Sequence, residues 1–177
     1  MKQLLIALGL IVALVITGCS QDEKSTENSN DNTEDAEQAT DEKETQVALL
    51  DVQLNLTKAV SPHQQKINAY LLALQDESST EETIQTTEEE AKTAATEAKN
   101  LLNDYEIQVE LPDQEKEQYQ KAITTLNNYY QQVETGLNSE AADLKEAEAT
   151  WEKFQEQIAE IYEAADLMVP DMADALS

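Results

Sequence analysis

The sequence predicts an all-α protein in which an antiparallel bundle of about four helices follows a signal peptide and a disordered acidic tether. Between residue 46 and the C-terminus, apolar residues recur at spacings of three and four, which is the period of an amphipathic helix. Before that, an apolar run ends abruptly at Cys19 and gives way to a long polar segment. We therefore expect three parts, 1–18, 19–44 and 45–177, of which the last has the length of one domain.

The first part has the organisation of a secretory signal peptide. Lys2 supplies a positive charge near the start, and an apolar run of 13 residues, broken only by Gly9, extends from Leu4 to Ile16. This run is short against the roughly 20 apolar residues that a helix needs to span a bilayer. A basic start, a short apolar core and small residues before a cleavage site indicate a segment that is removed after export.

The residues around the cysteine, Ile16-Thr17-Gly18-Cys19, resemble the lipobox of bacterial lipoproteins. The resemblance implies that Ile16, Thr17 and Gly18 are recognised by the signal peptidase, and that a diacylglycerol is attached to the Cys19 thiol. Two acyl chains on one residue would anchor the protein stably, whereas a single chain binds only marginally. The protein would then be extracytoplasmic, on the outer face of the cell membrane. Its use of lysine without arginine favours a Gram-positive host.

The segment after Cys19 is expected to be a disordered linker. Residues 20–44 contain ten acidic residues and two lysines, and no apolar residue larger than alanine. Such a segment cannot bury enough apolar surface to offset the entropy that is lost on ordering. Repulsion between its carboxylates would extend it further, so that it would separate the folded domain from the membrane.

The folded part is strongly acidic, which excludes several classes of partner. Residues 45–177 contain 27 acidic residues and eight lysines, and the whole chain has a net charge of −26. Nucleic acid is excluded as a partner because binding it requires lysine and arginine side chains that neutralise phosphates. The same negative charge would repel the protein from anionic lipid and from anionic wall polymers.

Two apolar stripes at helical spacing predict the third and fourth helices. The first consists of Tyr119, Ile123, Leu126, Tyr130, Val133 and Leu137, and the second of Leu144, Ala147, Trp151, Phe154, Ile158, Ile161, Ala165 and Met168. Gly136 is expected to end the earlier helix, and Asn138 or Ser139 to cap the later one. Because Tyr129 and Tyr130 are adjacent, we expect one of them to point away from the core.

An alanine-rich stripe predicts the second helix. It consists of Ile84, Ala91, Ala94, Ala98, Leu101 and Tyr105. Its small side chains should allow a neighbouring helix to approach closely, and Ser79 and Glu82 have the spacing of a capping box at its start. Residues 107–111 alternate like a strand but are too short and isolated to pair. We therefore expect a connection there that ends at Pro112.

The first helix is the least regular, because a proline lies within it. Its stripe consists of Leu56, Val60, His63, Ile67, Tyr70 and Leu74. Ser61, Pro62 and Gln64 are of the residue types found at the start of a helix. Two alternatives therefore remain open: the helix is kinked at Pro62, or it stops there and restarts.

No residue pattern in the mature chain indicates catalysis, a metal or a cofactor. A di-iron bundle needs Glu-x-x-His pairs, but the single histidine, His63, has Val60 three positions before it. We interpret His63 as a hydrogen-bonded histidine of the core or of a groove. Gly136 is the one glycine after Cys19, which excludes a glycine-rich phosphate loop. With Cys19 lipidated, no thiol remains for disulfides, redox chemistry or zinc, and no serine lies in a nucleophile motif. We therefore expect neither an enzyme nor a bound cofactor.

Two functions remain compatible with these features. The leading interpretation is a protein-interaction module that docks an unidentified protein of the cell envelope. The alternative is a binding or sensing module for a small solute or cation between the helices. A pocket of several hundred cubic ångströms lined by tyrosines and His63 would favour the alternative, whereas a uniformly packed core would favour the first. The architecture of the mature part resembles that of small helical lipoproteins of Bacilli described as cell-wall-binding.

The C-terminal tail, residues 170–177, continues the apolar spacing beyond Pro170 through Met172 and Leu176. A tail of this kind either folds over the end of the bundle and caps its core, or stays exposed as a short docking strip, since methionines adapt to varied surfaces. We expect the tail to cap the core.

Overall fold

The computed structural model describes the backbone of residues 34–139 and 143–177, and the side chains from residue 41 onward in these ranges. All regular secondary structure within them is helical, which confirms the predicted all-α class. The helices are α1 (Glu34–Gln75), α2 (Glu81–Asn103), α3 (Asp113–Leu137), α4 (Lys145–Ala164) and the short α5 (Met172–Leu176). The predicted signal peptide and the lipobox-like residues through Cys19 lie outside the described residues.

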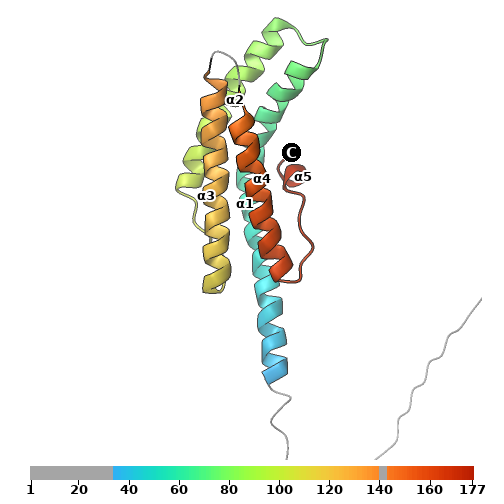
Figure 1. Cartoon of the computed structure of the whole chain (residues 1–177), viewed down its shortest axis with the longest axis vertical. Coiled ribbons are helices and arrows are strands. Elements are labelled where there is room, and N and C mark those ends of the chain that lie inside the picture. The colour runs from blue at the N-terminus through green and yellow to red at the C-terminus, as the bar shows by residue number, and fades with distance from the viewer. Residues whose placement is uncertain (1–33, 140–142) are drawn as a thin grey trace, which may run out of the picture.

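The four long helices form an antiparallel bundle, as predicted. They run alternately up and down in Figure 1, with α1 against α2, α2 against α3 and α3 against α4. The connections 76–80, 104–112 and 138–144 are short, which favours antiparallel neighbours. Residues of all five helices contribute to one apolar core.

Helix α1 begins earlier than the sequence predicts. We expected a disordered linker over residues 19–44, but the backbone is helical from Glu34 onward. The reason is that helix propagation is easy once a packed helix exists, because each added residue gains a hydrogen bond. Residues 36–39 (Ala-Glu-Gln-Ala) are also good helix formers. The remainder of the predicted linker, residues 19–33, lies outside the described residues.

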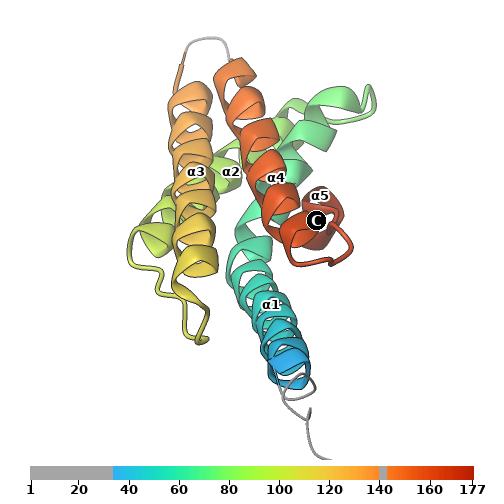
Figure 2. The same ribbon diagram turned by 60° about the horizontal axis from the view of Figure 1, so that its bottom comes forward.

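Pro62 lies inside α1, which is continuous from Glu34 to Gln75. The alternative in which the helix stops and restarts is therefore wrong. The axis of α1 changes direction between its two halves (Figure 2), as expected where a proline removes a hydrogen bond and its ring crowds the preceding turn. The helix tolerates this because Pro62 and Lys58, whose carbonyl loses its partner, are both exposed to solvent. Near the end of the helix Ala73 is buried, whereas the predicted core residue Leu74 is 49% exposed.

Helix α2 packs through alanine, as predicted. Ala91, Ala94, Ala95 and Ala98 are completely buried, and side chains of this size let adjacent backbones approach closely. The cap differs from the prediction by one residue. Thr80, rather than Ser79, is the N-cap, and its hydroxyl oxygen accepts a hydrogen bond from the Thr83 amide at 3.1 Å.

Helix α3 buries its whole predicted stripe, and Gly136 lies at its C-terminal end. The carbonyl oxygen of Asp143 comes so close to Gly136 that a Cβ there would collide with it. The glycine is thus required for the return of the chain toward α4. The predicted caps of α4 are wrong: Asn138 is the C-cap of α3, and α4 begins after Leu144, where Asp143 Oδ1 accepts a hydrogen bond from the Lys145 amide at 3.2 Å.

Helix α4 ends at Ala164, before the end of its apolar stripe. Asp166 has a φ of 53°, and the Leu167 amide donates to the Tyr162 carbonyl oxygen at 2.8 Å. This pattern is a Schellman motif, which terminates a helix with a left-handed residue. Met168 is therefore 92% exposed, contrary to the prediction that it belongs to the core seam.

The C-terminal tail is folded, and its two large apolar residues are buried. Met172 and Leu176 are 1% and 0% exposed on α5, which packs against α1. Asp171 caps α5 by accepting from the amides of Ala173 and Asp174 at 3.0 and 3.1 Å. The tail thus covers core, as predicted, but it lies alongside the bundle rather than over its end (Figure 1).

Candidate functional site

A pocket of about 420 Å³ lies between α1 and α4, with α3 behind it and α5 at its edge. We call it the α1–α4 pocket. Its lining residues are Gln64, Asn68, Leu71, Tyr129, Glu148, Trp151, Glu152, Gln155 and Ala173. This volume suits a small molecule, but other hollows of about 300–470 Å³ occur on the described surface, so the lining rather than the volume distinguishes this pocket.

The bend in α1 accounts for the position of this pocket. Before Pro62, α1 and α4 are joined: the Gln46 side chain donates to the Ala165 carbonyl oxygen at 2.8 Å, and the Tyr162 hydroxyl lies 2.6 Å from Gln53 Oε1. The later half of α1 turns away from α4 (Figure 2), and its residues Gln64, Asn68 and Leu71 line the pocket together with residues of α4.

Gln64 forms the polar inner wall of the pocket. Its side-chain amide donates to Asn68 Oδ1 at 2.9 Å and to the Tyr129 hydroxyl at 3.2 Å. Its Oε1 accepts from the Tyr130 hydroxyl at 2.8 Å. Gln64 is buried, and these three bonds use both its donor hydrogens and its oxygen. Because two of the three partners are tyrosines of α3, that helix determines the orientation of the Gln64 side chain.

Aromatic rings form a second part of the lining. The ring centroids of Tyr129 and Trp151 are 5.2 Å apart, and their planes are inclined at 53°. Tyr130 contacts Tyr129 edge-on at 4.8 Å, and Phe154 supports Trp151 at 5.4 Å. Trp151 is only partly buried, which leaves part of its ring open to the pocket. We expected one of Tyr129 and Tyr130 to point away from the core, but both are buried, because α3 packs on α2 and α4 at once.

The pocket carries negative charge. Glu148 and Glu152 lie one turn apart on α4 at its rim, and no lysine is present among its described lining residues. Burial raises the pKa of the Tyr129 phenol, and the nearby Glu148 carboxylate raises it further, against the hydrogen bond from Gln64. Tyr129 is therefore neutral at physiological pH, and the charge of the pocket comes from the two carboxylates.

His63, the residue on which the ligand-binding interpretation partly depended, does not line the pocket. Its Nδ1 lies 3.4 Å from Oε2 of Glu97 on α2. This position between α1 and α2 agrees with the expected histidine of the core or of a groove, but its buried Nδ1 makes no hydrogen bond within the described residues, so the hydrogen-bonded part of that interpretation is not confirmed. No cluster of three or more histidine, cysteine or acidic side chains suited to a metal occurs in the described part of the chain.

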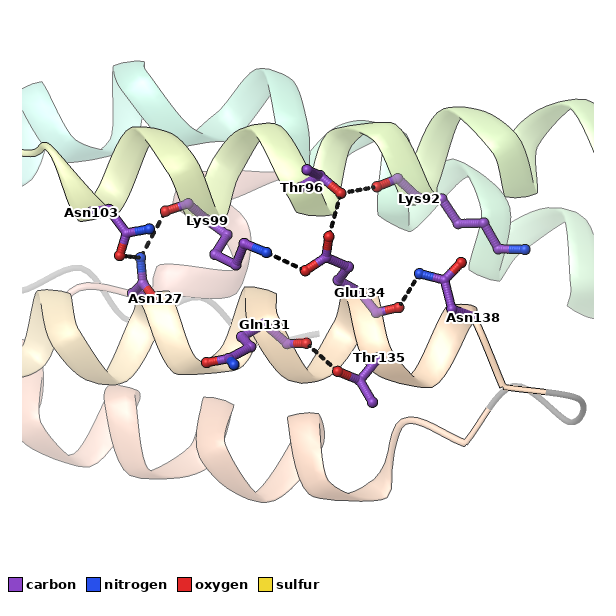
Figure 3. A network of polar contacts seen from close by, with 9 residues as sticks. All are labelled: Lys92, Thr96, Lys99, Asn103, Asn127, Gln131, Glu134, Thr135 and Asn138. Atoms are coloured by element: carbon purple, nitrogen blue, oxygen red, sulfur yellow. Dashed lines mark hydrogen bonds and ion pairs between the residues drawn. The ribbon is translucent and has the colours of Figure 1, made fainter.

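A second polar cluster joins α2 to α3 (Figure 3). The Thr96 hydroxyl donates to Glu134 Oε1 at 2.7 Å, and the Lys99 ammonium pairs with Glu134 Oε2. The Asn127 amide donates to the Lys99 carbonyl oxygen at 2.8 Å. The hydrogen bond from Lys99 is the main contact that lowers the pKa of Glu134. Both oxygens of the carboxylate are used within the protein, so we interpret this cluster as a structural link between the helices.

An exposed apolar stripe follows the outer face of α1 before its bend. Val47, Leu50 and Leu54 are 59%, 48% and 64% exposed. We call these three residues the α1 stripe. It lies opposite the buried residues Leu49 and Val52, so α1 presents apolar side chains on two faces.

Comparison with protein-family models, with curated proteins and with solved structures finds no match to this chain. Among the helices that the structure describes, none has both the length and the apolar composition to cross a membrane.

The helical stripes predicted that Trp151 and Tyr130 belong to the core, but they did not indicate that these residues lie at one site with Gln64. A signal was present. Gln64 is four residues after Val60 and three before Ile67, so it occupies a stripe position with a polar side chain. A buried amide needs hydrogen-bond partners, and the adjacent tyrosines of α3 were the candidates.

Proposed function

We propose that this protein is an extracytoplasmic lipoprotein that binds a small solute in the α1–α4 pocket. In this proposal Cys19 carries the lipid that holds the protein on the outer face of the cell membrane. The residues between Cys19 and α1 connect the anchor to the bundle.

The observation that carries the proposal is the pocket itself. It is preformed, because Gln64, Tyr129 and Tyr130 hold one another by hydrogen bonds and ring contacts. It combines aromatic surface with a few oriented polar groups, which is the usual composition of a small-molecule site. The sequence led us to expect tyrosines and His63 around such a pocket. Tyr129 lines it, but His63 lies beside Glu97 of α2 instead.

The test uses the full chain in a non-ionic detergent and a panel of small anions, cations, sugars and neutral amphiphiles. Trp151 is the single tryptophan, so its fluorescence reports on the pocket directly. We expect saturable quenching by at least one member of the panel. Ala173→Phe, which places a ring at the pocket edge, should abolish it, whereas Ala149→Phe on the exposed surface of α4 should not.

Two results would contradict solute binding: no response from any panel member, or equal binding by the Ala173→Phe variant. Docking of an envelope protein is the second candidate, and the α1 stripe is the observation that favours it. Crosslinking on intact cells tests it. Val47→Ser with Leu54→Ser should remove a crosslinked neighbour that survives the Ala173→Phe substitution.

A further inference from the structure

We propose that the ligand of the α1–α4 pocket is an organic ammonium ion, a cation whose nitrogen carries alkyl groups. This inference rests on the proposed solute-binding function and specifies the chemistry of the solute. Three features of the pocket favour this class over anions and metal ions.

The first feature is the aromatic wall. Trp151 and Tyr129 both line the pocket, with ring centroids 5.2 Å apart and planes inclined at 53° rather than stacked, and Trp151 is the more exposed of the two. A cation within about 6 Å of such rings is attracted by their negative faces, and tryptophan is the best partner. Alkyl groups on the cation would also bury apolar surface against Leu71.

The second feature is the charge at the rim. Glu148 and Glu152 are four residues apart on α4, and like charges at this spacing repel each other. A bound cation between the rings and these carboxylates would relieve that repulsion. An anion would meet two negative charges and, among the described lining residues, no lysine.

The third feature is that the side-chain amide of Gln64, at the inner wall, is already fully hydrogen-bonded. Gln64 has already used both its amide hydrogens and its oxygen within the protein. Gln64 therefore offers no free donor to the oxygens of an anion. A bare metal ion is disfavoured too, because the pocket supplies two rim carboxylates and no cluster of three suitable ligands in the described chain.

The experiment measures Trp151 fluorescence of the full chain in a maltoside detergent, which contains no ammonium group. The probes are choline, tetramethylammonium, and 3,3-dimethylbutan-1-ol, which has the shape of choline without the charge. We expect saturable binding of both cations and roughly threefold to thirtyfold weaker binding of the neutral alcohol.

A pair of matched variants tests the role of the rim charges. Glu148→Gln with Glu152→Gln should weaken choline binding at least about threefold and reduce its sensitivity to salt. Glu160→Gln with Glu163→Gln removes the same charge from exposed positions of the same helix, away from the pocket, and should leave binding unchanged.

Nα-acetyl-lysine amide forms a separate arm, since a lysine of a partner protein also carries an ammonium group. If this probe binds as tightly as choline, the ligand is not a free small solute but a lysine side chain of a peptide or protein.

The failure of the ammonium assignment differs from failure of the proposed function. If the neutral alcohol binds as tightly as choline, the ammonium assignment is wrong and solute binding stands. The same conclusion follows if choline does not bind but another panel member does, and Ala173→Phe blocks the binding of that member. If neither the cations nor any panel member alters Trp151 fluorescence, both are wrong. If both glutamate pairs weaken binding equally, the pocket does not recognise the charge.

Discussion

The Tyr130 hydroxyl on α3 donates a hydrogen bond to Oε1 of Gln64 on α1 at 2.8 Å, through the buried centre of the bundle. Both side chains are buried, at 0% and 7% exposure, so neither group can exchange this bond for one with bulk water. The bond fixes Gln64 relative to Tyr129 and thereby defines the inner wall of the pocket.

Tyr130→Phe should destabilise the protein by about 1–3 kcal/mol, because it leaves the Gln64 oxygen buried without this donor. Urea unfolding followed by circular dichroism measures the effect. Combining it with Gln64→Leu should cost less than the sum of the single changes, since Gln64→Leu also removes the oxygen that Tyr130→Phe leaves without a donor. Tyr105→Phe removes a hydroxyl from the connection after α2 and serves as the control. Additive costs would show that the two residues do not depend on each other.

Trp151→Ala should cost less than Phe154→Ala. Truncating a fully buried aromatic ring to alanine costs about 3–5 kcal/mol. Phe154 is 0% exposed, whereas Trp151 lies at the partly open pocket. We therefore expect the full loss of stability for Phe154→Ala. For Trp151→Ala we expect roughly 1–3 kcal/mol, because part of the ring already contacts solvent. Calorimetric unfolding compares the two, and a larger loss at Trp151 would contradict this arrangement.

Glu134→Gln should destabilise the protein at neutral pH and have less effect in acid. The Lys99 contact holds the pKa of Glu134 below its ordinary 4.5, so the ionised form is favoured by folding. Its stabilisation is complete above the unfolded pKa and is lost as pH falls through the lower, folded pKa. We expect a difference of about 0.5–1.5 kcal/mol at pH 7 that shrinks below pH ~4. Glu160→Gln, at an exposed position of α4, is the control. A difference that stays constant with pH would exclude this role for the carboxylate.

Removing residues 170–177 should lower the unfolding temperature by several degrees, which corresponds to about 1 kcal/mol or more. The reason is that Met172 and Leu176 are buried against the bundle and their loss exposes core. Replacing both by serine in the full chain should have a similar effect. Met168→Ser, at a position that is 92% exposed, should leave the melting curve unchanged. An unaltered melting temperature after truncation would show that the tail contributes nothing to stability.

Cys19→Ala should release the protein from the membrane if Cys19 carries the lipid. The measurement compares membrane and medium fractions of the expressing cells, together with metabolic labelling by a radioactive fatty acid. We expect loss of the label and of membrane retention. Ser20→Ala, next to the cysteine, should change neither. Retention and labelling of the Cys19→Ala chain would rule out lipidation at this residue.

Local patterns were sufficient for the helices themselves. The stripe from Tyr119 to Leu137 is buried throughout α3, and the alanines from 91 to 98 form the α2 seam, because helical period and side-chain size are properties of neighbouring residues. Caps were less predictable. Thr80 and Ser79 are chemically similar, so the sequence alone could not decide which of them begins α2.

The sequence by itself thus determined the helical class, the approximate extent of the helices, the acidic surface and the lipobox-like segment. Tertiary structure decided which faces are covered. Tyr129 is buried only because α3 has neighbours on two sides, and Leu74 is exposed although it continues a stripe. The α1–α4 pocket likewise depends on where α1 bends relative to α4, and on side chains brought together from residues as distant as Gln64 and Tyr129. Helical periodicity describes one helix at a time, whereas a pocket exists only between helices.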